Sequence, residues 1–251
     1  MPGTGMRPVY AEVIRAQWRV PPNVHAFTTT REGGVSAGPY SSFNLGAHVG
    51  DDAQTVVQNR ARAVARFELP SEPVWLTQVH GDNIVCADRY IAGQDADGSY
   101  TATTRTVCAV MTADCLPLFL CDASATRVGL FHIGWRGLAR GLVRKAARLF
   151  NGGGGASAWL GPAIGPGAFE VGGEVKTTIE SALDCRPECF VPVAGGKWLA
   201  NLYALTAGEL GHEGVACSFD DSLCTWSDPS RFYSHRRSSP CGRMASLVWM
   251  E

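Results

Sequence analysis

The hydrophobic pattern of the chain consists mainly of short apolar runs, separated by polar or glycine-rich turns. Runs rich in β-branched and aromatic residues predict strands at 24–30, 107–111, 116–121, 127–133 and 158–160. Residues 73–88 are PVWLTQVHGDNIVCAD, and the two apolar runs around a His-Gly-Asp-Asn turn predict a β-hairpin. The tail at 224–250 is expected to hold two more strands, joined by an arginine-rich loop.

Helical periodicity marks four further segments. It predicts helices at 51–67, 138–150, 174–183 and 202–212, the last with Asn201 as its N-cap. On the helix at 138–150, Arg140, Arg144 and Arg148 form a stripe that is expected to be a solvated face.

The order of these elements indicates the fold class. Strands outnumber helices and do not alternate strictly with them, which favours an α+β fold of mixed β-sheets flanked by helices. A loop at 31–52, rich in Gly, Ser, Pro and Asn, is long enough that an ordered, functional loop is expected. Residues 1–10 are expected to be frayed.

Composition narrows the class of protein. The 251 residues are 45% hydrophobic and 18% charged, which allows a sizeable core in one large domain or two small ones. The formal net charge of -1 gives no electrostatic reason to bind nucleic acid or an anionic membrane. No apolar run is long enough to span a bilayer, and the first residues lack a signal-peptide core. A soluble, cytoplasmic protein is therefore expected.

The nine cysteines are odd in number, scattered, and form no CxxC pair. Cys185 and Cys189 have a CxxxC spacing, which is not a usual zinc-ribbon spacing. This usage does not indicate a disulfide framework, so most of the cysteines are expected to be reduced and partly buried.

Three residues could carry chemistry together. Asp114 and Pro117 interrupt the strand pattern, which predicts that Cys115 lies at a strand end or bulge, while His132 precedes a glycine-rich turn and His80 lies beside another turn. Two imidazoles and a thiolate suit zinc with an open fourth position for water. They could equally form a cysteine nucleophile with a histidine base. The residue pattern leaves both open, beside the simpler interpretation of a buried thiol and two hydrogen-bonded core histidines.

Longer blocks of sequence point to a family. The chain resembles the YfiH family, also described as the laccase-domain or peptidoglycan editing factor family, over roughly residues 24–250. The resemblance implies a single domain with a layered fold of that family. The blocks that carry it are GGVSAGPYSSFNLGAHVGDD, WLTQVHGDNIV, DADGSYTATT, VMTADCLPLFLCD, HIGWRGLARGLV, WLGPAIGPGAFEVGGEV, NLYALTAGEL and FYSHRRSSPCGRMASLVWM.

The family pattern has a metal trio, and its three positions here are His80, Cys115 and His132. The resemblance therefore implies that these residues are both metal ligands and catalytic residues, with zinc as the expected ion and copper as an alternative. Two positions depart from the family pattern: His235 stands where Tyr or Phe is usual, and Cys241 stands where Thr is common. Neither departure affects the trio, so they bear on substrate preference.

Family members are described as acting on purine nucleosides. The implied reactions are phosphorolysis of adenosine, inosine and methylthioadenosine, and deamination of adenosine by an activated water. Phosphorolysis also needs an anion site, for which Arg136 at a helix start and the guanidinium groups of the C-terminal loop are candidates. The expected substrate-binding residues are Asn44, Gln78, Arg136, Arg236 and Arg243, with Arg237 as a further guanidinium group. The expected partners are a purine nucleoside and phosphate, and the oligomeric state is not indicated.

Two other activities fit parts of the pattern. A copper-dependent polyphenol oxidase is one, but the chain has only six histidines and no HxH pair, whereas a multicopper oxidase needs several histidine-rich copper sites. A cysteine hydrolase that acts on cell-wall precursors is the other, with Cys115 as nucleophile. Metal dependence separates these alternatives. The DADG segment at 95–98 lacks the later ligands of a calcium loop and is interpreted as a turn.

Overall fold

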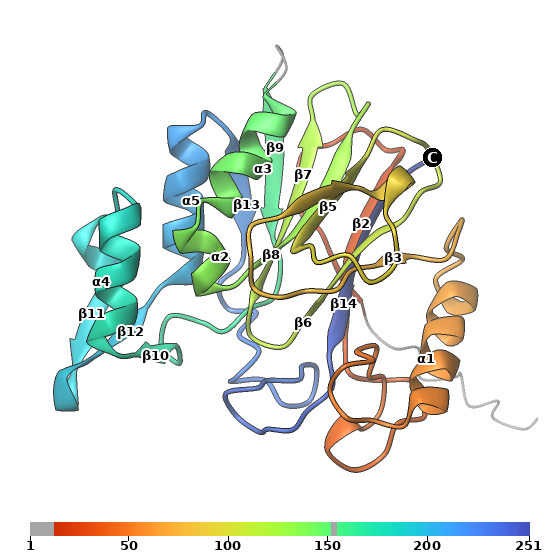
Figure 1. Ribbon diagram of the computed structural model, residues 1–251, viewed down its shortest axis with the longest axis horizontal. Helices are drawn as coiled ribbons and strands as arrows, with labels where there is room; N and C mark the ends of the chain where they lie inside the picture. The colour runs from red at the N-terminus through yellow and green to blue at the C-terminus, as the bar shows by residue number, and fades with distance from the viewer. Residues whose placement is uncertain (1–12, 152–154) are drawn as a thin grey trace, which may run out of the picture.

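The computed structural model describes residues 13–151 and 155–251, so the segment predicted to be frayed, 1–10, lies outside the described residues. Two large β-sheets form the centre of the molecule (Figure 1). In spatial order, the five-stranded sheet contains β1 (Val13–Arg15), β2 (Val24–Thr29), β14 (Met244–Met250), β6 (Cys108–Thr112) and β3 (Val74–Trp75). The six-stranded sheet contains β13 (Ala216–Phe219), β9 (Ala156–Leu160), β7 (Leu116–Asp122), β8 (Val128–Ile133), β5 (Gly98–Thr101) and β4 (Ile84–Cys86).

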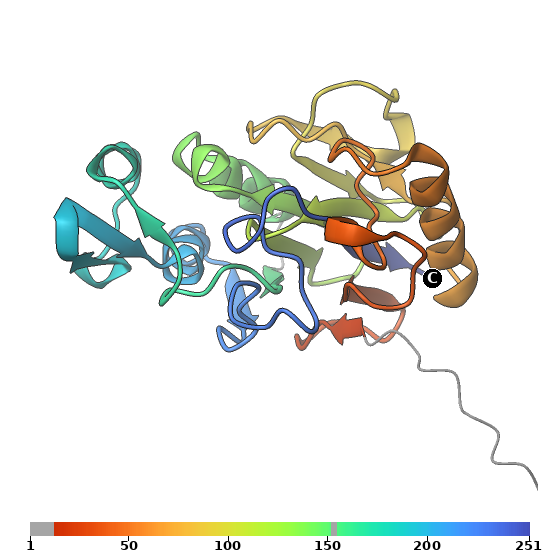
Figure 2. The ribbon, with the colours of Figure 1, turned by 90° about the horizontal axis from the view of Figure 1, so that it is seen from below.

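Helices cover the outer faces of the two sheets (Figures 1 and 2). α1 (Ala53–Arg66) packs on the five-stranded sheet, and α2 (Trp135–Ala139), α3 (Leu142–Phe150) and α5 (Leu202–His212) pack on the six-stranded sheet. At one end of the molecule, α4 (Gly173–Ala182) lies on a small sheet of β10 (Glu170–Val171), β12 (Lys197–Ala200) and β11 (Phe190–Val193). Short 3₁₀ turns are η1 (Gly38–Tyr40), η2 (Ala87–Arg89), η3 (Pro187–Cys189) and η4 (Ala194–Gly196).

Strand β7 explains why the chain forms a layered structure. Leu118 and Leu120 point to the helices, whereas Phe119 and Cys121 point into the layer between the two sheets. All four side chains are buried, because both faces of the strand are covered. The predicted α+β fold of mixed sheets flanked by helices is confirmed. None of the helices in the described ranges is both long and apolar enough to cross a bilayer.

The predicted hairpin at 73–88 is wrong. Its two runs form β3 and β4, which lie in different sheets and pair in parallel with β6 and β5. The turn between them does not join paired strands. Instead, the backbone N–H groups of Val79, His80 and Gly81 all donate to the carboxylate of Asp97. A carboxylate that directly precedes β5 thus replaces the hairpin hydrogen bonds, and this contact could not be seen in the local pattern.

Two helix predictions need correction in detail. The helix expected at 138–150 is divided into α2 and α3. Gly141 lies between them, and its φ of 84° interrupts the helical backbone. The arginine stripe is also not simply solvated, since Arg144 and Arg148 pair with Glu209 and Glu213 at α5 and its C-terminal end. The helix at 202–212 is confirmed, and the Asn201 side chain caps it by accepting from the Ala204 N–H.

The tail prediction is half right. Within 224–250 only β14 forms a strand, and residues 226–243 form a chain of turns instead. Side chains hold this loop in place: the Arg237 guanidinium donates to the carbonyls of Thr225, Trp226 and Phe232. The apolar residues of the loop, such as Phe232 and Tyr233, are buried by packing rather than by strand pairing.

Candidate functional site

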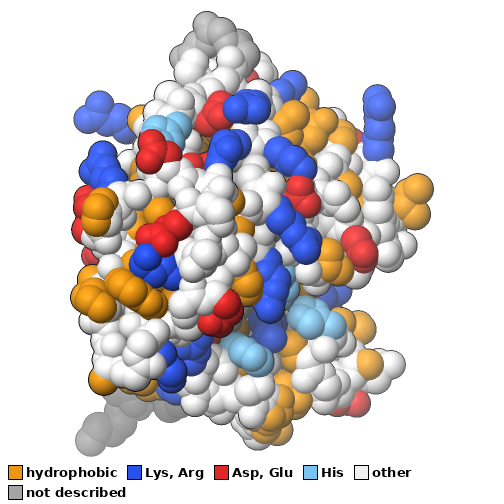
Figure 3. Space-filling model, turned by 60° about the vertical axis from the view of Figure 1, so that its left-hand side comes forward, with side chains coloured by type: hydrophobic (Ala, Val, Ile, Leu, Met, Phe, Trp, Pro, Cys, Tyr) orange, Lys and Arg blue, Asp and Glu red, His pale blue; other side chains and the backbone are white. Residues whose placement is uncertain are grey.

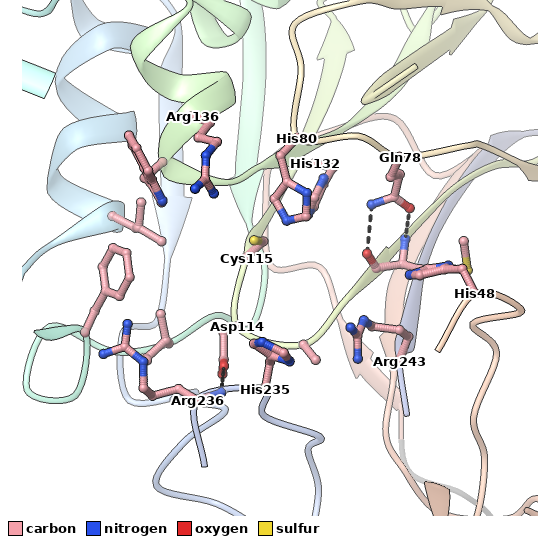
Figure 4. A pocket seen from close by; sticks show the side chains of 16 residues that line it. His48, Gln78, His80, Asp114, Cys115, His132, Arg136, His235, Arg236 and Arg243 are labelled. Carbon is pink, nitrogen blue, oxygen red and sulfur yellow. Dashed lines mark hydrogen bonds between the residues drawn. The ribbon is translucent and has the colours of Figure 1, made fainter. Parts of the chain in front are cut away.

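A cavity of about 390 Å³ opens beside the end of the six-stranded sheet where β7 begins and β8 ends (Figure 4). Histidines gather beside Lys and Arg side chains on the surface of one face of the molecule (Figure 3). Segments from almost the whole chain meet in the cavity wall. The lining residues are His48, Gln78, His80, Met111, Ala113, Asp114, Cys115, His132, Trp135, Arg136, Ile164, Phe169, Leu202, His235, Arg236 and Arg243.

The structure brings His80, Cys115 and His132 together. Their candidate ligand atoms all lie within 4.8 Å of one another, and the two imidazole rings have centroids 4.7 Å apart. Cys115 directly precedes β7 and His132 lies in β8, which is the neighbouring antiparallel strand. His80 comes from the connection between β3 and β4. The three side chains therefore converge because two adjacent strands and one turn end at the same place.

Asp97 is buried beneath this trio and holds two of its members. Its carboxylate accepts from His132 Nδ1 at 2.8 Å and from the His80 backbone N–H at 2.9 Å, while its backbone carbonyl accepts from the His132 N–H at 2.7 Å. Because Nδ1 of His132 faces a carboxylate, it carries a proton, and Nε2 is the nitrogen that would give its lone pair to a metal ion. Asp97 thus fixes the tautomer of His132 and the position of His80.

Backbone conformation also shapes the trio. His80 has a φ of 58° and Asp114, next to Cys115, has a φ of 93°, so both ligand segments bend sharply beside the site. Gly134 leaves the necessary room: a Cβ there would lie 3.0 Å from His80 Cδ2 and 3.2 Å from Cys115 Sγ. A larger residue at position 134 would therefore push into the cluster.

Cys115 and His132 strongly affect each other's ionisation. Burial works against the thiolate, but the charges and hydrogen bonds of His132 and His80 outweigh it and lower the pKa of Cys115 to about 6. Burial likewise works against the imidazolium, but Cys115 and Asp97 outweigh it and raise the pKa of His132 to about 9. Without a metal ion, the pair is therefore a thiolate and an imidazolium near neutral pH.

The donor set fits a zinc ion. Two imidazole nitrogens and one thiolate are borderline-soft ligands, and Cys115 already favours the thiolate that zinc requires. Bonds of about 2.0–2.3 Å place donor atoms of one zinc ion roughly 3.3–3.8 Å apart, so a small contraction of the trio is enough. The same donors would also accept copper, because thiolate and imidazole are good copper ligands.

Three arginines line the cavity on two sides of the trio (Figure 4). Arg136 stacks its guanidinium on Trp135, with 4.4 Å between Cζ and the ring centroid. Arg236 lies over Phe169 and donates from Nη1 to the Glu170 carbonyl. Arg243 lies across the cavity from both of them, beside His48. All three residues predicted to bind substrate through a guanidinium therefore reach the cavity wall.

The two amide side chains predicted to bind substrate are placed differently. Gln78 lines the cavity, but its amide pairs with the backbone N–H and carbonyl of Met111 at 2.7 and 2.9 Å. Asn44 is fully buried and does not belong to the cavity wall. Its Oδ1 accepts from the N–H groups of Gly46 and Arg243, both at 2.9 Å. Asn44 thus reaches the cavity only through Arg243.

Several residues of the site were not predicted from the sequence. The DADG segment was interpreted as a turn, although its second aspartate is Asp97, and the only local signal was a carboxylate directly before a strand. Trp135 and Phe169 form part of the wall, and His48 comes from the long loop at 31–52. Partial burial, with the charges of Arg243 and Arg60, lowers the pKa of His48. That loop thus contributes to the cavity.

Asp114 ties the arginine-rich loop to the site. Its carboxylate accepts from Thr225 Oγ1 and from the Arg236 N–H, both at 2.7 Å, and its carbonyl accepts from the Ile164 N–H. Three chain segments are therefore joined at the residue before Cys115.

Comparisons with known proteins identify the family of the chain. The family model described as multi-copper polyphenol oxidoreductase laccase matches residues 25–251. A Pseudomonas aeruginosa protein named purine nucleoside phosphorylase is 48% identical over 95% of this chain and 98% of its own. The Escherichia coli purine nucleoside phosphorylase YfiH is 45% identical over 96% and 99%.

Solved structures show the same fold. A Neisseria meningitidis protein superposes with a TM-score of 0.88 at 40% identity, over 95% of this chain and 99% of its own. The Bacillus licheniformis protein YfiH superposes with a TM-score of 0.84 at 30% identity, over 91% and 93%. With its layered sheets, its His-Cys-His cluster and these relatives, the chain belongs to the YfiH family, the family of laccase-like domains.

Proposed function

We propose that the protein is a zinc-dependent purine nucleoside phosphorylase that acts on adenosine, inosine and methylthioadenosine, with adenosine deaminase as a side activity. The observation that carries the proposal is the cluster of His80, Cys115 and His132 in a cavity lined by three guanidinium groups. The names of the Escherichia coli and Pseudomonas aeruginosa relatives, which are purine nucleoside phosphorylases, support the phosphorylase activity.

The cavity has the groups that each reaction needs. Guanidinium groups bind a phosphate oxyanion well, since each offers several charged N–H donors in a fixed plane. A bound zinc ion would supply a Lewis acid for activating water or polarising the substrate. The chain's own part is to hold that ion with His80, Cys115 and His132 and to fix the His132 tautomer through Asp97.

Metal content and phosphate dependence test this proposal together. The purified protein would be analysed for bound metal and incubated with adenosine, inosine or methylthioadenosine, with and without phosphate. Products would be separated by chromatography. We expect phosphate-dependent release of free base and phosphate-independent formation of inosine from adenosine. Cys115→Ala should lose both the metal and the turnover. Cys217→Ala is the matched control, because it removes a half-buried thiol from β13, outside the cavity.

Other results would assign another activity. Bound metal without nucleoside turnover would contradict the proposal, and oxidation of phenols by the copper-loaded protein would favour a polyphenol oxidase. Activity that survives a chelator but is blocked by alkylation of Cys115 would favour a cysteine hydrolase, which the lowered pKa of this thiol would suit.

A further inference from the structure

We infer that the cavity is divided into two subsites on opposite sides of the metal cluster, with phosphate bound at Arg243 and the purine base bound against Trp135 and Phe169. The inference rests on the proposed phosphorylase function and assigns a role to each end of the cavity. It also makes Asn44 a positioning residue for the anion rather than a contact with the substrate.

The fold holds Arg243 both at its backbone and at its guanidinium group. Its backbone N–H donates to Oδ1 of the fully buried Asn44, and its Nη1 donates to the carbonyls of Cys241 and Gly242. A Cβ at Gly46 would lie 2.8 Å from Arg243 Cγ, so the glycine lets the arginine stem pass. Within residues 13–151 and 155–251, nothing accepts a hydrogen bond from Nε or Nη2 of Arg243, so two charged donors remain for a ligand.

Asn44 is in turn fixed by its own partners. Its Nδ2 donates to Asp51 Oδ2 at 2.9 Å and to the Gly46 carbonyl at 3.2 Å. The hydrogen-bonding groups of this buried amide are therefore used by Gly46, Asp51 and the Arg243 N–H, and its effect on a ligand passes through the Arg243 backbone. A loop that is held this tightly sets where the guanidinium can lie.

Charge separates the two ends of the cavity. Asp114 is the only acidic residue among the described side chains that line it, and its carboxylate accepts from the Arg236 N–H. It lies near Arg236 in Figure 4, whereas Arg243 lies toward the other side with His48. Arg60 adds positive charge at that side, where it donates to the Leu45 carbonyl. Arg136 and Arg236 share their end of the cavity with the Asp114 carboxylate, whereas no acidic side chain among the described lining residues lies beside Arg243, so an anion is better stabilised at the Arg243 end.

The other end of the cavity has an apolar and aromatic wall beside Arg136 and Arg236. Ile164, Phe169 and Leu202 belong to the core cluster that covers the six-stranded sheet, and Trp135 packs against the same cluster. The flat rings of Trp135 and Phe169 offer surfaces on which a purine can stack, and Arg136 and Arg236 already lie over them. This wall suits a base much better than a phosphate.

The chemistry of phosphorolysis requires such an arrangement. A phosphate oxygen forms a bond to C1′ of the ribose while the C1′–N9 bond breaks, and the base leaves with the electron pair of that bond and gains a proton. In an in-line displacement the phosphate approaches from the side of C1′ opposite the base. Two subsites on opposite sides of the cavity would hold the two reactants in that geometry.

The test separates the Michaelis constants of the two substrates. We expect Arg243→Gln to raise the KM for phosphate about tenfold or more, since charge-assisted hydrogen bonds are lost, and to leave the KM for inosine within about twofold. Phe169→Leu should do the reverse and raise the KM for inosine about fivefold. Arg62→Gln is the matched control for loss of a guanidinium, because Arg62 is exposed on α1 and outside the cavity; it should change neither constant.

One further variant and the zinc content of all variants guard the result against misfolding. Arg243→Lys keeps a positive charge and should retain part of the phosphate affinity, and all variants should keep the zinc content of the unchanged protein. Overturning results are a rise in the KM for inosine alone in Arg243→Gln, or a tenfold rise in the KM for phosphate in Arg136→Gln with none in Arg243→Gln. Phosphate-induced stabilisation against heat gives an independent readout: it should be present in the unchanged protein and lost in Arg243→Gln.

The same measurement distinguishes failure of the subsites from failure of the proposed function. If no nucleoside is turned over, the phosphorylase proposal fails, but loss of phosphate stabilisation in Arg243→Gln would still support the anion subsite. Equal phosphate stabilisation in both proteins would exclude it.

Discussion

At the scale of single residues, the site depends on a carboxylate that lies outside the candidate ligand cluster. Asp97 accepts hydrogen bonds from the His132 ring and from the backbone of the turn that carries His80. Its complete burial removes competing water, so these hydrogen bonds are the ones that satisfy the charge. The carboxylate thus sets both histidines before any ion arrives.

We expect Asp97→Asn to weaken zinc binding about 10–100-fold, since an amide satisfies His132 Nδ1–H less well and disturbs the turn at 79–81. Competition with a chromophoric chelator measures the affinity directly. Asp95→Asn is the matched control, because Asp95 is an exposed carboxylate of the same DADG segment. Equal zinc affinity in both variants would show that Asp97 does not orient the ligands.

The pair of Cys115 and His132 predicts an unusual pH dependence for the alkylation of Cys115 in the zinc-free protein. The thiolate reacts with iodoacetamide, and the pKa of Cys115 is lowered to about 6, so the alkylation rate should hold steady from pH 9 to 7 and fall only near pH 6. His132→Gln should move the midpoint of this pH profile upward, because it removes the main positive charge that stabilises the Cys115 thiolate. Peptide mapping identifies the modified thiol, and burial raises the pKa of Cys108 and Cys121 to about 12, so they should not compete. A midpoint that does not move in His132→Gln would contradict the pairing.

At the scale of elements, helix α3 shows how packing overrides a surface pattern. Arg144 donates to Glu209, whose side chain is only 3% exposed, and also to the Ala182 carbonyl. Arg148 pairs with Glu213 in a far more exposed position. Both arginines belong to the same stripe on the helix, yet Arg144 lies at a buried interface between α3 and α5 and Arg148 lies at the surface.

Arg144→Ala should therefore lower the free energy of unfolding by about 3 kcal/mol, because it leaves the Glu209 carboxylate buried without its cation. Arg148→Ala should cause a much smaller loss, since water can replace the partner of an exposed pair. Urea denaturation of the two variants beside the unchanged protein makes the comparison. Similar losses in both would mean that the stripe is a solvated face after all.

The elements that could be predicted from the sequence are those whose cause is local. The helix at 202–212 follows from its periodicity and from Asn201, and the strand around His132 follows from its apolar residues. The prediction of a hairpin at 73–88 failed because the turn bonds to Asp97, which lies beyond the segment and directly precedes β5. The same holds for the site: the trio was visible through the family resemblance, but Asn44 and Asp97 act through contacts that only the fold creates.

At the scale of the whole molecule, the His-Cys-His cluster joins parts of the chain that the sheets keep apart. His80 follows β3 of the five-stranded sheet, whereas Cys115 directly precedes β7 and His132 lies in β8 of the six-stranded sheet. A bound ion would therefore link the connection between β3 and β4 to the six-stranded sheet, in addition to any chemical role.

We expect removal of the ion by a chelator to lower the melting temperature, because a ligand that binds the folded state stabilises it by RT ln(1 + [L]/Kd). Re-addition of zinc should restore the melting temperature. Cys115→Ala should melt at the same temperature with and without chelator, since it lacks the site, whereas Cys217→Ala should keep the difference. An unchanged melting temperature after verified metal removal would show that the ion does not brace the fold.

The central place of β14 has a consequence for the time at which the protein becomes active during synthesis. β14 pairs on one side with β2 and on the other with β6, and Thr28 bonds Ser246 across 218 positions of the chain. Arg243, which precedes β14 directly, completes the cavity. A ribosome that has made every other strand has thus produced a five-stranded sheet with a gap in its middle and a cavity without one wall. The edges of β2 and β6 that pair with β14 stay open until β14 has emerged, so we expect the cavity to be complete only after that strand leaves the exit tunnel.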